Sequence, residues 1–176
     1  FSTPDATITC PVPTPTSTGV PTPTPGGSTT ITIPIPTGTD DAEEVESSGA
    51  MSLTSSDLEL TMDASKQTIG MFFTGLSIPQ GAVITNAYIE FIAKEQQPDI
   101  TDLAFYAQAA DNPATFTSTS GNISSRPKTV SSTYWSNIGV WTIGTKYITP
   151  DLSSVVQEVV NRPGWASGYA MVFIVT

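Results

Sequence analysis

The chain has 176 residues, a net charge of −10 and only 12% charged residues, so Thr, Ser, Asn and Gln must supply most of its polar surface. Six basic residues against 16 acidic ones argue against nucleic acid or an anionic membrane surface as a partner, because both need clustered Lys and Arg. His is absent, which removes the commonest general base and the commonest transition-metal ligand.

The chain carries no apolar run of about 18 residues, so we expect no transmembrane segment. It begins at Phe1 without a signal peptide, and we interpret it as a mature form whose leader has been removed. The expected location is therefore extracellular, at the cell surface or secreted.

Two regions of different composition follow one another along the chain. Residues 1–39 form a Thr/Pro-rich extended tail, and residues 40–176 have the composition of a folded β-domain. Thr/Pro-rich sequence cannot bury a core and favours polyproline-like conformations, which is typical of a solvated stalk that can carry O-linked glycans.

The tail contains an internal repeat with the chemistry of a β-strand. Residues 7–16 and 30–39 are identical at seven of ten positions. Apolar residues alternate with polar residues or proline in both copies, so each copy presents one apolar face. We predict that these residues are donor-strand anchors: Ile8, Cys10 and Val12 in the first copy, and Ile31, Ile33 and Ile35 in the second.

Prolines block one edge of each copy. Residues at i and i+2 of a strand direct their backbone groups to the same edge, and proline has no N–H to donate. We therefore predict that Pro11 and Pro13 block one edge of the first copy, and that Pro34 and Pro36 block one edge of the second. Each copy can pair through its other edge only, which is the pattern of an edge strand.

Cys10 is the single cysteine of the chain, so it cannot close an internal disulfide. It occupies an apolar position of the repeat, and a small apolar anchor is one interpretation of it. An intermolecular disulfide is the alternative.

Acidic residues are concentrated between positions 40 and 63, where no basic residue is present. One hypothesis is a Ca²⁺ site built from carboxylate and carbonyl oxygens, although the spacing matches no EF-hand. Its ligands would come from Asp40, Asp41, Glu43, Glu44, Asp57 and Glu59. The alternative is a solvated acidic face without any cofactor.

Within the domain, alternating or apolar segments predict strands at residues 51–54, 58–62, 69–74, 82–93, 100–109 and 169–175. The segment 82–93 is apolar on both faces and is predicted as a central strand. Residues 111–146 are expected to be rich in loops, and Asn122-Ile123-Ser124 matches an N-glycosylation acceptor.

One helix is predicted after Thr149. This residue can act as the N-cap, Pro150 suits the first helical position, and Asp151 favours the positive end of the helix dipole. The apolar residues that follow at helical spacing are Leu152, Val155, Val156 and Val159.

The aromatic residues near the end of the chain allow two interpretations. Trp135, Trp141 and Trp165 could form a platform on which sugar rings stack, or they could pack in the core around the helix. No residue is marked as a nucleophile or as its base, so we do not expect an enzyme.

From residue 40 onwards the chain resembles a module of bacterial secreted and surface proteins. The motifs that carry the resemblance are DDAEE at 40–44, SSDLEL at 55–60, IPQGAVI at 78–84, AYIEF at 87–91, SRPKT at 125–129 and RPGWASG at 162–168. These are similar to motifs of DNRLRE-type and carbohydrate-binding-module-like domains. The resemblance implies a jelly-roll-like β-sandwich, and such modules usually continue into one further strand after a segment like 169–175. We therefore expect a sandwich that lacks one strand and has an open apolar groove, completed by a donor strand from a neighbouring subunit. The alternative is self-complementation, in which the strand folds back into its own domain.

Two functions from different classes follow. The first is a structural subunit of an extracellular, pilus-like filament, in which copies of the chain join head to tail by N-terminal donor-strand exchange. The second is a carbohydrate-binding or adhesion module that recognises surface glycans from a Pro/Thr stalk.

Overall fold

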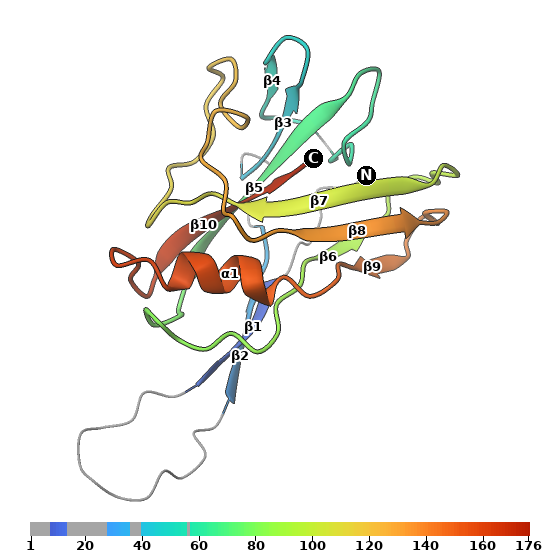
Figure 1. Ribbon diagram of the computed structural model, residues 1–176. Coiled ribbons are helices and arrows are strands. Elements are labelled where there is room, and N and C mark those ends of the chain that lie inside the picture. The colour runs from blue at the N-terminus through green and yellow to red at the C-terminus, as the bar shows by residue number, and fades with distance from the viewer. Residues whose placement is uncertain (1–7, 14–27, 36–39, 56) are drawn as a thin grey trace, which may run out of the picture.

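The computed structural model describes residues 8–13, 28–35, 40–55 and 57–176. These residues form a mainly-β fold with a single helix among them, which confirms the predicted fold class (Figure 1). All paired strands are antiparallel.

The larger layer is a six-stranded sheet in the order β4-β3-β5-β10-β7-β8. Its strands are β3 (Asp41–Val45), β4 (Met51–Ser52), β5 (Gln67–Leu76), β7 (Thr101–Ala107), β8 (Thr133–Ile138) and β10 (Tyr169–Val175). The predicted apolar segment 169–175 matches β10, which lies between β5 and β7 and is buried on both faces. Its two faces pack in two different apolar clusters, so neither reaches solvent and the strand can be apolar throughout.

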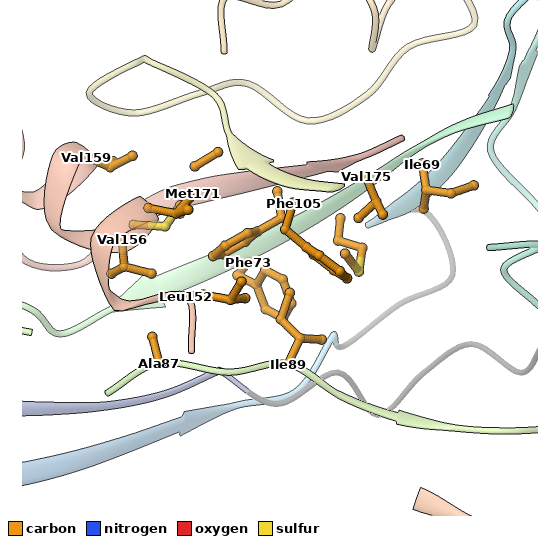
Figure 2. Packing of buried hydrophobic residues seen from close by; sticks show 14 of the residues in the cluster. Ile69, Phe73, Ala87, Ile89, Phe105, Leu152, Val156, Val159, Met171 and Val175 are labelled. Carbon is orange, nitrogen blue, oxygen red and sulfur yellow. The ribbon is translucent and has the colours of Figure 1, made fainter. Parts of the chain in front are cut away.

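The second layer is smaller and less regular. It contains the two-stranded sheet of β6 (Glu90–Ile92) and β9 (Lys146–Ile148), the helix α1 (Ser153–Val160) and the extended segment 82–89. Figure 2 shows apolar side chains from both layers meeting between them, with Phe73 and Phe105 from the large sheet opposite Ile89 and Leu152. The resulting architecture is sandwich-like.

The two N-terminal repeats form a separate two-stranded ribbon. β1 (Ile8–Pro13) and β2 (Ser28–Ile33) pair with each other and with no other strand in the described part of the chain. One end of this ribbon lies beside the extended segment 82–89, and the other projects away from the domain (Figure 1).

The outer face of the large sheet is covered by a loop from the region 111–146, which was predicted to be rich in loops. Phe116 and Ile123 of this loop pack on Ala42, Phe72 and the outer side of β10. Arg126 holds the loop by donating to the carbonyl oxygens of Asn122 and Ala114, both at 2.8 Å. Several hydrogen bonds from one guanidinium therefore fix a segment that has no secondary structure of its own.

Two predicted strands differ in the structure. Only residues 90–92 of the segment 82–93 are a strand, because three amides before them bond to side chains rather than to another strand. Residues 58–62 form no strand, and Met62 makes only an isolated bridge with Lys66. β8, conversely, lies within the region that was predicted to be rich in loops.

The helix begins later than predicted, at Ser153 rather than at Pro150. Thr149 is not its cap, because the Thr149 hydroxyl accepts a hydrogen bond from the Ile89 amide at 3.1 Å. Asp151 instead accepts the Ser153 amide at 2.9 Å. The four predicted core residues of this segment, Leu152, Val155, Val156 and Val159, are all buried.

Candidate strand-docking site

The candidate site is the place where β2 lies against the domain. Exposure falls along this segment, from an exposed Ser28 through half-buried Ile31 and Ile33 to Ile35, which is 9% exposed. Ile35 belongs to the main core, Ile31 and Ile33 pack against that core, and β2 contacts β5. The three isoleucines therefore complete the apolar interior of their own domain.

The backbone of β2 takes no part in either sheet of the domain. It pairs with β1 alone, in a register that places Cys10 opposite Ile31, Ile8 opposite Ile33 and Val12 opposite Thr29. Among the described residues, β2 is therefore held on the domain by side-chain packing.

The prolines determine which edges face each other in the ribbon. Pro11 and Pro13 have no N–H, so the amides of β1 that donate across the pair must be those of Ile8, Cys10 and Val12. The opposite residues, Ile31 and Ile33, therefore use the edge that lacks proline. β1 is described by its backbone alone, and Pro36 lies outside the described residues.

The extended segment 82–89 lies beside the ribbon. Along one edge of this segment, hydrogen bonds of 2.8, 3.0 and 3.1 Å run from the amides of Ile84, Ala87 and Ile89 to the side chains of Gln157, Asp151 and Thr149. β10 has a paired strand on each side, so the open groove that was expected beside the segment 169–175 is not at an edge of β10.

Two carboxylates of β3 point to the inner side of the sheet. Ala42 between them belongs to the outer core, so Asp41 and Glu43 lie on the opposite face. Asp41 is 4% exposed, and its Oδ2 atom has no hydrogen-bond partner among the described residues. Burial, together with the nearby Glu43 and Asp40 carboxylates, raises the pKa of Asp41 to about 6, although a backbone hydrogen bond and Lys94 act to lower it.

Glu43 has a partner and a smaller perturbation. Its Oε1 atom accepts the Glu59 amide at 2.8 Å. Burial nevertheless raises the pKa of Glu43, and the neighbouring Glu59 and Asp57 carboxylates add to the effect. Burial likewise raises the pKa of Glu59.

The residues proposed as Ca²⁺ ligands are divided between two faces of β3. Glu44 is on the outer face, where its Oε2 atom accepts the amides of Ile123 and Ser124 at 2.7 and 2.9 Å. Glu44 therefore anchors the covering loop. In the part of the chain that the structure describes, no three acidic or cysteine side chains are grouped closely enough to hold a metal ion.

Two of the three tryptophans of the predicted glycan platform are inside the molecule. Trp141 is 0% exposed and contacts Tyr147 and Trp135, with ring centroids 4.2 and 5.6 Å away. Trp165 is 3% exposed and donates its indole N–H to the carbonyl of Ile78 at 2.9 Å. Neither offers a ring face to a sugar, and Trp135 alone is half-exposed. Trp141 and Trp165 therefore pack in the core, which was the alternative interpretation.

A shallow cleft of about 310 Å³ lies at another place on the domain. Its lining is Leu60, Thr61, Met62, Gln97, Asp99, Ile100, Thr101, Asp102 and Trp141. Met62 and Ile100 are 58% and 72% exposed, so much of its apolar surface is open to solvent.

Asn122 of the glycosylation triplet takes part in the covering loop. Its Oδ1 atom accepts the Thr117 amide at 3.0 Å and an Arg126 N–H at 3.1 Å. The sequence did not predict this network around Arg126. Most of its partners are backbone carbonyls, which no residue type identifies in the sequence.

Comparisons with protein families, with curated proteins and with solved structures found no match for this chain. No helix among the described residues combines the length and the apolar character needed to cross a membrane.

Proposed function

We propose that this chain is a structural subunit of an extracellular filament, in which copies join head to tail by exchange of N-terminal strands. The observation that carries the proposal is the way in which β2 is held. Its isoleucines complete the core of the domain, yet its backbone bonds to neither sheet in the described part of the chain. Its backbone pairs instead with another N-terminal strand, β1, so a strand from a second copy could take that place, which is recognition by strand addition.

The strand chemistry of the two repeats supports the same proposal. An uncovered strand edge invites a further strand, and natural proteins normally cover such an edge. In a filament, a strand of the next subunit would cover the pairing edge of β2. The contact is heterologous, with one surface on the donor and another on the recipient, so it can continue without closing.

The isoleucines hold β2 on its own domain. Complete burial of one isoleucine side chain contributes about 1.5–3 kcal/mol, and Ile35 is nearly buried. Ile31 and Ile33 contribute less because they are half-buried. Together the three residues keep β2 in place as the strand to which another strand can pair.

The second candidate function, carbohydrate binding or adhesion, has less support. Its predicted platform depends on tryptophans of which two are buried. The cleft beside Trp141 does not expose a face of that ring. We therefore favour the structural role, without catalytic activity and without a required cofactor.

Electron microscopy of the purified chain, beside the variant Ile33→Asp, tests the proposal. The wild-type chain should form filaments. Ile33→Asp should abolish them, because a carboxylate cannot enter the core without a large cost, while circular dichroism still reports a folded domain. Thr32→Asp is the matched control, since Thr32 is exposed and next in sequence. Filaments that persist in Ile33→Asp, or a wild-type chain that stays monomeric at all concentrations, would contradict the proposal.

A further inference from the structure

The two strands of the ribbon differ in how far they can move from their domain. Five residues, 36–40, separate Ile35 from the start of β3 at Asp41. Six Cα steps span at most about 20 Å even when the chain is extended. A domain of residues 40–176 is expected to have a radius of gyration of about 14 Å, and hence a diameter of roughly 35–40 Å. β2 therefore cannot readily reach the corresponding place on a neighbour.

β1 has a much longer connection. The 14 residues 14–27 separate it from β2, and a chain of that length can span up to about 50 Å. This distance exceeds the expected diameter of one domain. β1 can therefore reach the ribbon position of an adjacent copy while its own β2 stays in place.

The partner of β1 is the backbone edge of β2 alone. β1 pairs with no other described strand, and the pairing amides lie on the edge that lacks proline in both repeats. Copies of the chain are identical, so β1 of a neighbour finds the same edge, the same register and the same hydrogen bonds. Exchange of β1 loses none of the contacts that the isolated chain makes.

The projecting end of the ribbon makes this edge accessible. Ser28, Thr29 and Thr30 are exposed, and this end points away from the domain in Figure 1. A strand from outside can begin to pair there and then extend towards Ile31 and Ile33. β2 meanwhile remains seated through Ile35, which is 9% exposed.

We infer that the exchanged strand of the filament is β1, and that it pairs with the Ile31–Ile33 edge of β2 in a second copy of the chain, while β2 stays on its own domain. This inference rests on the proposed filament function and specifies its donor and its acceptor. β2 then has two roles, since its side chains complete the core and its backbone receives the neighbour.

A disulfide across the ribbon tests the inference in the full-length chain. Cys10 lies opposite Ile31 in a pair that exchanges hydrogen bonds, where Cα atoms are about 5.5 Å apart, and this separation suits a disulfide. The variant Ile31→Cys is assembled under reducing conditions, examined by electron microscopy, oxidised and analysed on a denaturing gel without reductant. Cys10 is the only natural cysteine, so every cross-link involves it. Ser28→Cys is the matched control, because Ser28 lies opposite Pro13, about 10 Å along the strand from Ile31.

The expected result is filaments whose oxidised chains form a ladder of covalent multimers, with no ladder in the Ser28→Cys control. Filaments that contain only monomeric, internally cross-linked chains would overturn the inference and leave the filament proposal intact. Covalent dimers without filaments would support the exchange of β1 but contradict an open filament. A chain lacking residues 1–27 provides a second test, since it retains β2 but has no β1. Filaments formed by that truncated chain would also overturn the inference.

Discussion

Asp41 should make the domain less stable at neutral pH than it is at pH 4. The residue is 4% exposed, its Oδ2 atom has no hydrogen-bond partner in the described part of the chain, and burial raises its pKa from 3.8 to about 6. The folded chain therefore holds this proton more tightly than the unfolded chain does. Linkage then requires that the contribution of Asp41 to stability falls as pH rises from about 4 to about 6.

The magnitude follows from the two pKa values. A tenfold change in proton affinity corresponds to about 1.4 kcal/mol, so the difference between 3.8 and about 6 corresponds to about 3 kcal/mol. This cost is present in full above pH 7 and absent below pH 3.8. The substitution Asp41→Asn removes the charge while keeping the shape, and it should stabilise the domain by up to about 3 kcal/mol at pH 7.5.

The assay is urea unfolding of both proteins at several values between pH 4 and pH 8, with the difference in free energy of unfolding as the readout. The pKa of Asp151 is shifted in the opposite direction. Burial acts to raise the pKa of Asp151, but hydrogen bonds from Ser153 and from the Ala87 amide lower it below its ordinary value. That effect is common to both proteins and cancels in the difference. Asp99→Asn, at an exposed carboxylate, serves as the control. A stability difference between wild type and Asp41→Asn that is the same at pH 4 and pH 7.5 would refute the reasoning.

Two further substitutions test the packing of the domain. Val156→Asp should unfold the domain, because Val156 is 0% exposed and an unpaired buried carboxylate costs several kcal/mol. The control Ser154→Asp, on the exposed side of α1, should leave the circular dichroism spectrum unchanged. A folded Val156→Asp would mean that α1 does not face the core. Gly70→Ala should lower the free energy of unfolding by about 1–3 kcal/mol, because its Cβ atom would lie 2.5 Å from the ring of Phe116. Gly139→Ala, where a Cβ atom meets nothing within 4 Å, is the control, and equal melting temperatures for the two variants would show that the covering loop yields easily.

Sequence patterns predicted the parts of this fold in which burial is continuous. β10 was found because all but the first of its residues are buried, and the core face of α1 was found because its valines repeat at helical spacing. The start of α1 was predicted wrongly because a residue far away in sequence bonds to the expected cap. The Thr149 hydroxyl is a suitable cap in isolation, but Ile89, which is 60 positions earlier in sequence, uses it.

The segment 82–93 also depends on tertiary partners that its local sequence pattern cannot identify. Its alternation is that of a strand, and Ala87, Ile89 and Phe91 are indeed buried. Three of its amides, however, bond to the side chains of Gln157, Asp151 and Thr149, which no local pattern identifies as partners. For the candidate site, the repeat and its prolines were visible in the sequence, whereas the pairing of the two repeats with each other depends on register and could only come from the structure.

The placement of prolines in β1 also limits which further strands can pair with the ribbon. A third strand approaching the ribbon from the side of β1 would meet positions 9, 11 and 13, where Thr9 is the only residue with an N–H to offer. On the β1 side, the ribbon therefore does not readily recruit chains laterally in the manner of a cross-β aggregate. The prolines of the first repeat thus protect this side of the tail even where many copies are crowded together.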